Sequence, residues 1–112
     1  MQRNDSLYLK HIREAIHKIG QYTKGVSRPS FQKNSLIQDA VIRQIEIIGE
    51  ASKRLSEDIR ASNPDIPWED ISGMRYKLVH DYFGVDLEKV WLTVQTDIPT
   101  LKKQISKIIK SL

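Results

Sequence analysis

The chain has 112 residues, of which 39% are hydrophobic and 29% charged, and a formal net charge of +4. This length allows one modest hydrophobic core, so we expect a single domain over residues 1–112. The absence of cysteine excludes disulfide frameworks, thiolate metal sites and cysteine nucleophiles. The first residues show no signal-peptide pattern, and no run approaches the roughly 20 apolar residues that span a membrane, so we expect a cytoplasmic protein.

Apolar residues recur every three or four positions along the first half of the chain, which predicts two amphipathic helices. The first is expected from Asp5 to about Tyr22, and the stretch 25–30, rich in Gly, Ser and Pro, breaks the pattern. The second is expected to begin between residues 30 and 35 and to continue to about Ile59. Because its apolar residues cover much of its circumference, we expect it to be central or to bury one side in a second subunit.

Two further helical segments are predicted in the second half. Pro67 suits the start of a third helix, which is expected to end at Gly84. Asp86 can cap a fourth helix that extends to Leu112, and Pro99 is expected to kink it or divide it in two. No strand-like alternation is present, so we predict an all-α, up-and-down bundle of four to five helices.

The C-terminal helix concentrates lysines, and the sequence gives two explanations for them. The four residues are Lys102, Lys103, Lys107 and Lys110. Together with a pI of about 9.4, they are compatible with a nucleic-acid or nucleotide partner. Cations also stabilise the C-terminal end of a helix dipole, which requires no partner.

No set of side chains has the spacing of a metal site. His11 and His17 are six residues apart and lie on different faces of an ideal helix. The acidic residues of the second helix form no paired metal-binding motif, and phosphate loops of the Gly-rich type are absent. We therefore expect no metal and no cofactor.

The segment from Gly73 to Gly84, GMRYKLVHDYFG, concentrates side chains that can take part in catalysis: one Arg, one His, one Asp and two Tyr. The guanidinium of Arg75 can donate two parallel hydrogen bonds to phosphate oxygens, and the imidazole of His80 can accept and donate protons near neutral pH. Together they suit cleavage of a phosphodiester by its own 2′-hydroxyl. The histidine would withdraw the proton, and the arginine would stabilise the charge that develops on phosphorus.

Spacing alone does not make these two residues converge. On an ideal helix His80 lies about 140° from Arg75, whereas Tyr82 lies within about 20° of Arg75. A symmetric dimer would bring both copies of the segment around one cleft. A purely structural explanation is also open, in which Lys77 and His80 favour the helix C-terminus while Tyr82 and Phe83 pack at the turn.

The pattern Arg75-x4-His80-x-Tyr82 resembles the signature of HEPN ribonucleases, in the subgroup of HepT toxins. The similarity covers nearly the whole chain, including the segments Tyr8–Ile16, Asp39–Ala51, Pro67–Trp68 and Phe83–Trp91. It implies a HEPN-like helical bundle that dimerises and places two copies of the motif in a shared cleft. It also implies metal-independent cleavage of an RNA substrate.

The resemblance further implies a type II-like toxin–antitoxin pair. The partner would be a minimal nucleotidyltransferase antitoxin, which in related pairs silences the toxin by attaching AMP to a motif tyrosine. By this resemblance Arg75 and His80 are the catalytic pair and Tyr82 is the AMPylated residue. Tyr76 and Asp81 are candidate supporting residues.

One position departs from the family pattern. A polar residue such as Asn or Asp often follows the motif arginine, and here Tyr76 takes that place, although a phenol can also donate a hydrogen bond. The departure favours an alternative, a non-catalytic module that docks a nucleotidyltransferase or a nucleotide, with Arg75 holding phosphate. The clustering of His80, Asp81 and Tyr82 favours the ribonuclease, which is the function we predict. A purely structural helical dimer is the third possibility.

Overall fold

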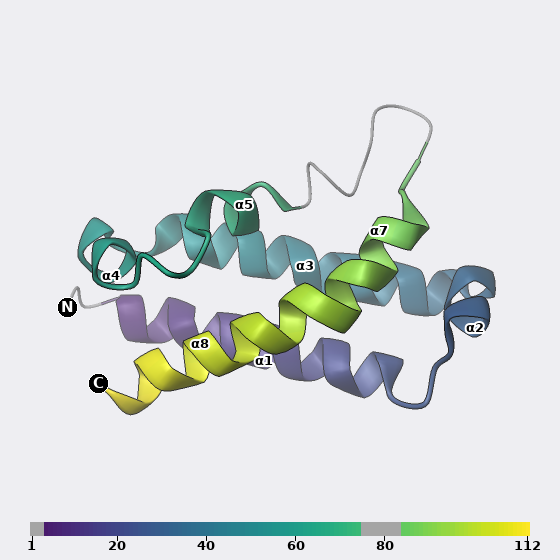
Figure 1. Ribbon diagram of the computed structural model, residues 1–112, viewed down its shortest axis with the longest axis horizontal. Coiled ribbons are helices and arrows are strands. Elements are labelled where there is room, and N and C mark those ends of the chain that lie inside the picture. The colour runs from purple at the N-terminus through teal and green to yellow at the C-terminus, as the bar shows by residue number, and fades with distance from the viewer. Residues whose placement is uncertain (1–3, 75–83) are drawn as a thin grey trace.

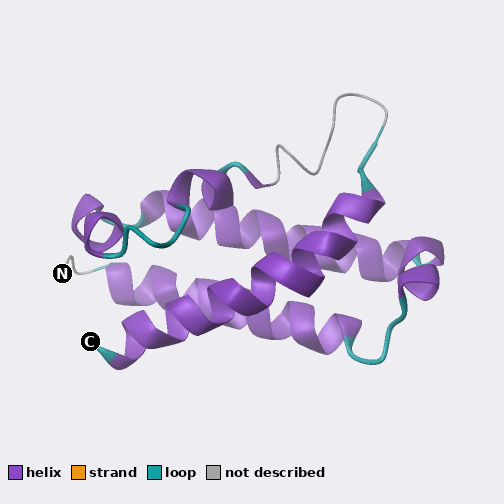
Figure 2. Ribbon diagram, viewed as in Figure 1, coloured by secondary structure: helices purple, strands orange, loops and turns teal. Residues whose placement is uncertain are grey.

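The described residues of the computed structural model, 4–74 and 84–112, form helices joined by short loops and contain no β-strand (Figure 2). This confirms the predicted all-α class. None of the helices in this part of the chain is long and apolar enough to cross a membrane. The elements, labelled in Figure 1, are α1 (Asp5–Thr23), α2 (Arg28–Lys33), α3 (Ser35–Arg54), α4 (Glu57–Ser62), α5 (Trp68–Ser72), α7 (Leu87–Leu92), η2 (Thr93–Asp97) and α8 (Ile98–Lys110).

The two longest helices, α1 and α3, lie side by side and form the centre of the bundle (Figure 1). Their facing residues recur every three or four positions and are fully buried, which is why this periodicity predicted that both helices exist. Burial of each such side chain contributes about 1.5–3 kcal/mol. The largest of these side chains are Leu9, Ile12, Ile19, Val41, Ile45 and Ile48. Helix α8 packs against α1 and closes the core.

Helix α3 ends earlier than predicted. The expected end at Ile59 is wrong, because α3 stops at Arg54 and Leu55 adopts an extended conformation with ψ 145°. Ser56 then caps the separate helix α4. The Asp5 carboxylate, only 1% exposed, accepts hydrogen bonds from the Ser56 backbone N–H at 2.8 Å and from its hydroxyl at 2.5 Å. The break is therefore held by a residue 51 positions away, at the start of α1.

Part of the predicted break after α1 is itself a short helix, α2. Gly25, at φ +73°, ends the first helical stretch as expected. The Ser27 hydroxyl then accepts a hydrogen bond from the Ser30 N–H and begins α2. Phe31 is fully buried, and the centroid of its ring lies 5.3 Å from that of the Trp91 ring. Helix α2 thereby connects the start of α3 with α7.

The predicted fourth helix stays helical from Leu87 to Lys110, with a π-helical turn before Pro99 in place of a break. Helix α7 continues into η2, where the N–H of Ile98 bonds to the carbonyl of Thr93, five residues earlier. Pro99 follows as the second residue of α8, a position at which its missing N–H costs little. The wider π-helical turn therefore accommodates Pro99, and the chain remains helical on both sides of it.

Candidate functional site

All five predicted site residues lie outside the described part of the chain. Arg75, Tyr76, His80, Asp81 and Tyr82 fall within the segment 75–83, and so does most of the third predicted helix. The described chain stops at Met74 and resumes at Gly84. The structure therefore shows how the two ends of the motif are held, together with the surface next to them.

The N-terminal end is held by α5, which packs on α3. Trp68, Ile71 and Met74 recur every three residues, and each is at most 8% exposed. The indole N–H of Trp68 donates a hydrogen bond to the carbonyl of Asn63 at 3.1 Å, which satisfies its buried polar atom. Met74, the last described residue before the motif, is thus fixed in the hydrophobic core.

Close approach of α5 to α3 depends on Gly49. A Cβ atom at this position would lie 3.3 Å from the carbonyl oxygen of Ser72 and 3.4 Å from that of Ile71. The glycine lets the backbone that leads directly into the motif rest on α3. Sequence reasoning missed this residue, although an isolated glycine within a helical pattern was an available signal of close packing.

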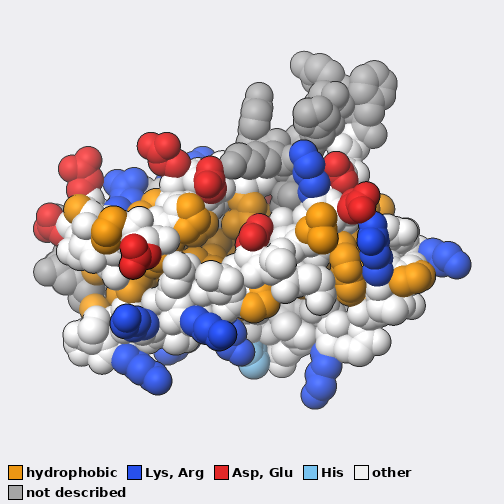
Figure 3. Space-filling model, in the orientation of Figure 1, with side chains coloured by type: hydrophobic (Ala, Val, Ile, Leu, Met, Phe, Trp, Pro, Cys, Tyr) orange, Lys and Arg blue, Asp and Glu red, His pale blue; other side chains and the backbone are white. Residues whose placement is uncertain are grey.

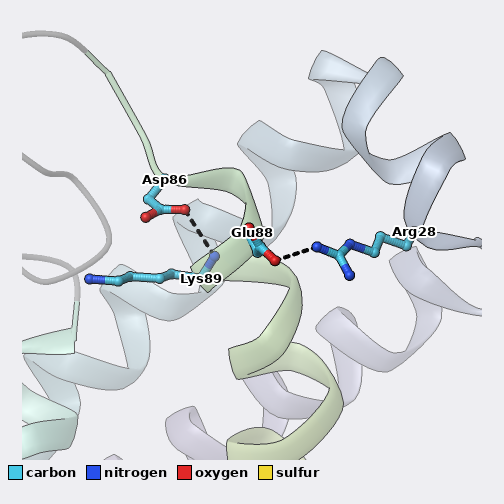
Figure 4. Close-up of polar contacts among 4 residues, drawn as sticks. All are labelled: Arg28, Asp86, Glu88 and Lys89. Atoms are coloured by element: carbon cyan, nitrogen blue, oxygen red, sulfur yellow. Dashed lines mark hydrogen bonds and ion pairs between the residues drawn. The ribbon is translucent and has the colours of Figure 1, made fainter.

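The C-terminal end of the motif is held by a turn and two polar contacts. Gly84 has φ +114°, a conformation that side-chain-bearing residues rarely adopt. The Asp86 carboxylate then caps α7 by accepting a hydrogen bond from the Lys89 N–H at 3.1 Å. Glu88 forms an ion pair with Arg28 of α2, as Figure 4 shows. The partner in this ion pair comes from an element that the sequence analysis treated as a break.

A surface cleft of about 600 Å³ lies beside the N-terminal end of the motif. Its walls come from α1, α3 and the end of α5, and it reaches Gly73, two residues before Arg75. Its lining residues include Tyr8, His11, Arg43, Glu46, Ile47, Gly49, Glu50, Lys53, Arg54, Ser72 and Gly73. The cleft thus joins the α3 surface to the point where the motif begins.

The charges in this cleft are partly paired. Nη1 of Arg43 lies 3.7 Å from Oε2 of Glu46, and Nζ of Lys53 lies 3.8 Å from Oε1 of Glu50. Arg54, which is exposed, forms no ion pair with a described residue. A guanidinium in this position can bind an anionic group such as phosphate. Within residues 4–74 and 84–112, no group of three or more His, Asp or Glu side chains is arranged to hold a metal ion.

Comparisons with known proteins agree on one family. The sequence model of the family described as "Ribonuclease HepT-like" matches residues 12–108, a span that includes the motif. The "Probable ribonuclease HepT" of Thermococcus cleftensis is 44% identical over 110 residues, covering 98% of this chain and 100% of that protein. A protein of Methanocaldococcus jannaschii, provisionally named an RNase, is 42% identical over 99% of this chain and 92% of its own length. No solved structure matches significantly.

We predict that Gly49→Ala stabilises the fold by about 1 kcal/mol less than a glycine-to-alanine change at an open helical position, because crowding of the added methyl group against the carbonyls of Ser72 and Ile71 offsets the gain in helix propensity. Gly20→Ala is the matched control, since Gly20 also lies within a helix but a Cβ added there would have no other atom within 4 Å. That control should gain up to about 1 kcal/mol from helix propensity. Urea unfolding of both variants measures the difference. Equal gains at the two positions would show that α3 and α5 do not approach closely.

Proposed function

The chain belongs to the HepT-like ribonuclease family, and from this membership we propose that it is a cytoplasmic, metal-independent endoribonuclease toxin. We propose Arg75 and His80 as its catalytic pair, and a nucleotidyltransferase antitoxin as the partner that silences it. The observation that carries the proposal is the family match over residues 12–108, within which Arg75-x4-His80-x-Tyr82 stands. The supports at both ends of this segment, on α3 and on α2, suit a motif that must be held in a fixed place.

The proposed reaction is transfer of the phosphate within the RNA. His80 withdraws the proton from a ribose 2′-hydroxyl, and the 2′ oxygen attacks the adjacent phosphorus. The bond from phosphorus to the 5′ oxygen breaks, and that oxygen takes up a proton. The products are a 2′,3′-cyclic phosphate and a 5′-hydroxyl end. Arg75 stabilises the negative charge that develops on the phosphoryl oxygens.

We propose that the protein is a homodimer that associates along an outward stripe of α3. The stripe repeats every three or four residues, as in a helix–helix seam, and consists of Leu36, Ala40, Arg43, Ile47, Glu50 and Arg54. In the single chain each of these residues is exposed or half-buried, and Leu36 is 78% exposed. Four of the six line the cleft beside the motif. A second copy on this stripe would therefore cover the cleft and bring the two motifs close together.

Electrostatics supports Tyr82 as the point of control. On an ideal helix it shares a face with Arg75, so an AMP group on its hydroxyl would place a phosphate near the cation that binds RNA phosphate. The two phosphates would compete for one guanidinium, and their like charge would oppose substrate entry. Inhibition then needs no refolding. Tyr76 is the rival acceptor, and non-covalent docking of the antitoxin is the rival mode of inhibition.

We expect purified protein to cleave RNA in the presence of EDTA and to leave a 2′,3′-cyclic phosphate or its hydrolysis product. His80→Ala and Arg75→Ala should each lower the rate by orders of magnitude, whereas Gln32→Ala, an exposed change on α2, should not. End-group analysis of the products tests the chemistry. Activity that is lost with EDTA, or that survives both substitutions, contradicts the mechanism, and binding without cleavage would favour the non-catalytic module.

Sedimentation at micromolar concentration should give twice the chain mass of 13.0 kDa. Ile47→Glu should shift the protein toward the monomer, because it buries a charge in the apolar part of the α3 stripe. Leu112→Glu changes an equally apolar, 53% exposed residue at the opposite end of the chain and should leave the dimer intact. A wild-type monomer, or a dimer that is insensitive to Ile47→Glu, would exclude the α3 interface.

Incubation with the cognate nucleotidyltransferase, ATP and Mg²⁺ should add the mass of one or more AMP groups to the peptide that holds Tyr82. Tyr82→Phe should remove this modification and leave RNA cleavage active in the presence of the partner, and Tyr76→Phe should change neither result. Mass spectrometry and a parallel cleavage assay measure both. If Tyr82→Phe is modified and silenced like the wild type, Tyr82 is not the switch.

A further inference from the structure

The net charge of the chain resides on one helix, α8. This helix holds four lysines and no acidic residue, while the other 14 Lys and Arg residues of the chain equal its 14 Asp and Glu residues. All four lysines are exposed. In Figure 3 several Lys and Arg side chains lie along the lower edge of the face, where α8 runs, and no Asp or Glu side chain is visible there, whereas the upper half shows side chains of both charges. The lysines of α8 therefore form a basic edge, while charges of both signs are mixed elsewhere on this face.

The helix dipole explains only half of these lysines. Lys107 and Lys110 lie in the last turn of α8, where a cation interacts favourably with the helix end. Lys102 and Lys103 are the fifth and sixth residues of the helix, too far from its end for this effect. None of the four forms an ion pair with a described residue. Neither an ion pair within the described chain nor the helix dipole therefore accounts for Lys102 and Lys103.

The lysines border two adjoining surface depressions. One, of about 260 Å³, lies between α1 and α8 and is lined by residues that include Arg13, His17, Lys102 and Ser106. The other, of about 580 Å³, is lined by Pro99 and Ser106 together with all four lysines of α8. Lys102 and Ser106 line both depressions, so the two lie next to each other. Among the described residues that form these walls, Glu14 alone is acidic.

We propose that this basic face, defined as Arg13, Lys102, Lys103, Lys107 and Lys110, binds the sugar-phosphate backbone of the RNA substrate away from the catalytic motif. The inference rests on the proposed ribonuclease function and adds a binding surface to it. Lysine ammonium groups, a guanidinium and a serine hydroxyl are the donors that contact RNA phosphate and sugar. Contacts of this kind carry no sequence information, so the face holds the strand in place regardless of its sequence.

The size of the molecule sets the length of RNA that this face requires. The longest dimension of the chain is 43 Å. A strand that advances about 3.4 Å per nucleotide crosses this dimension in about 13 nucleotides. An RNA of about 20 nucleotides is therefore longer than the chain itself and can contact the basic face while it is also held elsewhere on the protein, whereas RNA of a few nucleotides covers only a small part of the surface. The proposal thus predicts that long substrates bind more tightly than short ones.

The test compares two charge-reversed variants of the full-length protein. Lys103→Glu with Lys107→Glu changes the basic face, and Lys24→Glu with Lys33→Glu changes two exposed lysines at the ends of α1 and α2. Both variants have a formal net charge of zero, so they differ only in where the charge is lost. The probe is a fluorescent 2′-O-methyl RNA of about 20 nucleotides and mixed sequence, which lacks the attacking hydroxyl and cannot be cleaved. Urea unfolding confirms that both variants are folded, and Lys103→Gln with Lys107→Gln provides a milder change.

Binding is measured over a range of salt concentrations. Loss of two phosphate contacts should reduce the slope of log affinity against log salt by about 1.4 and weaken binding about 25-fold near 0.1 M salt. The Lys24 and Lys33 variant should bind like the wild type. On cleavable RNA of the same length, the basic-face variant should show a higher KM with an unchanged kcat.

Equal weakening in both variants would overturn the proposal, because only net charge would then matter. Unchanged binding in the basic-face variant would also overturn it. In either case cleavage with normal kinetics leaves the proposed function intact. Absence of cleavage by the wild type removes the proposed function, whereas the binding of 2′-O-methyl RNA still reports on the basic face.

Discussion

Packing of α1 against α3 is the contact on which the other elements depend. These helices have 19 and 20 residues, long enough to form a wide, fully buried seam. The helices α2, α4 and α5 have only five or six residues each, and helices of that length are not stable alone in water. Each of them is helical because it rests on the central pair or on a neighbour that does. A change that loosens α1 and α3 would therefore also displace the elements that carry the motif.

The two ends of the motif segment are attached to different parts of this framework. Before the segment, α5 reaches the core through Met74 and contacts α3 closely at Gly49. After it, α7 is fixed to α2 by the Arg28–Glu88 ion pair and by the rings of Phe31 and Trp91. The ion pair is exposed and contributes little by itself, whereas the contact between the buried ring of Phe31 and the partly buried ring of Trp91 contributes more to the attachment of α7. Helix α2 is thus a structural support for the site despite its short length.

The parts of the fold that periodicity could predict are those held by local sequence. Helix α1 was expected to end at Tyr22 and ends at Thr23, and the all-α class was correct. The break after Arg54 was missed because Leu55 continues the apolar pattern, while the carboxylate of Asp5 that fixes the break lies far away in the sequence. Helix α2 was missed because it buries a single residue, too few to give a period. Contacts between distant segments decide both features.

The chemistry of the site was accessible from sequence to the extent that residue types determine it. Arg75 and His80 indicate phosphodiester chemistry by type alone, but an offset of about 140° on an ideal helix leaves their convergence undecided. No periodic pattern can settle this question, because convergence depends on contacts between segments that are distant in the sequence. The lysines of α8 are a second case in which sequence alone does not decide the role of a set of residues. Sequence order leaves both a helix end and a nucleic-acid partner open for them, and only the folded chain shows that Lys102 shares a depression with Arg13 of α1 and a second one with the other three lysines.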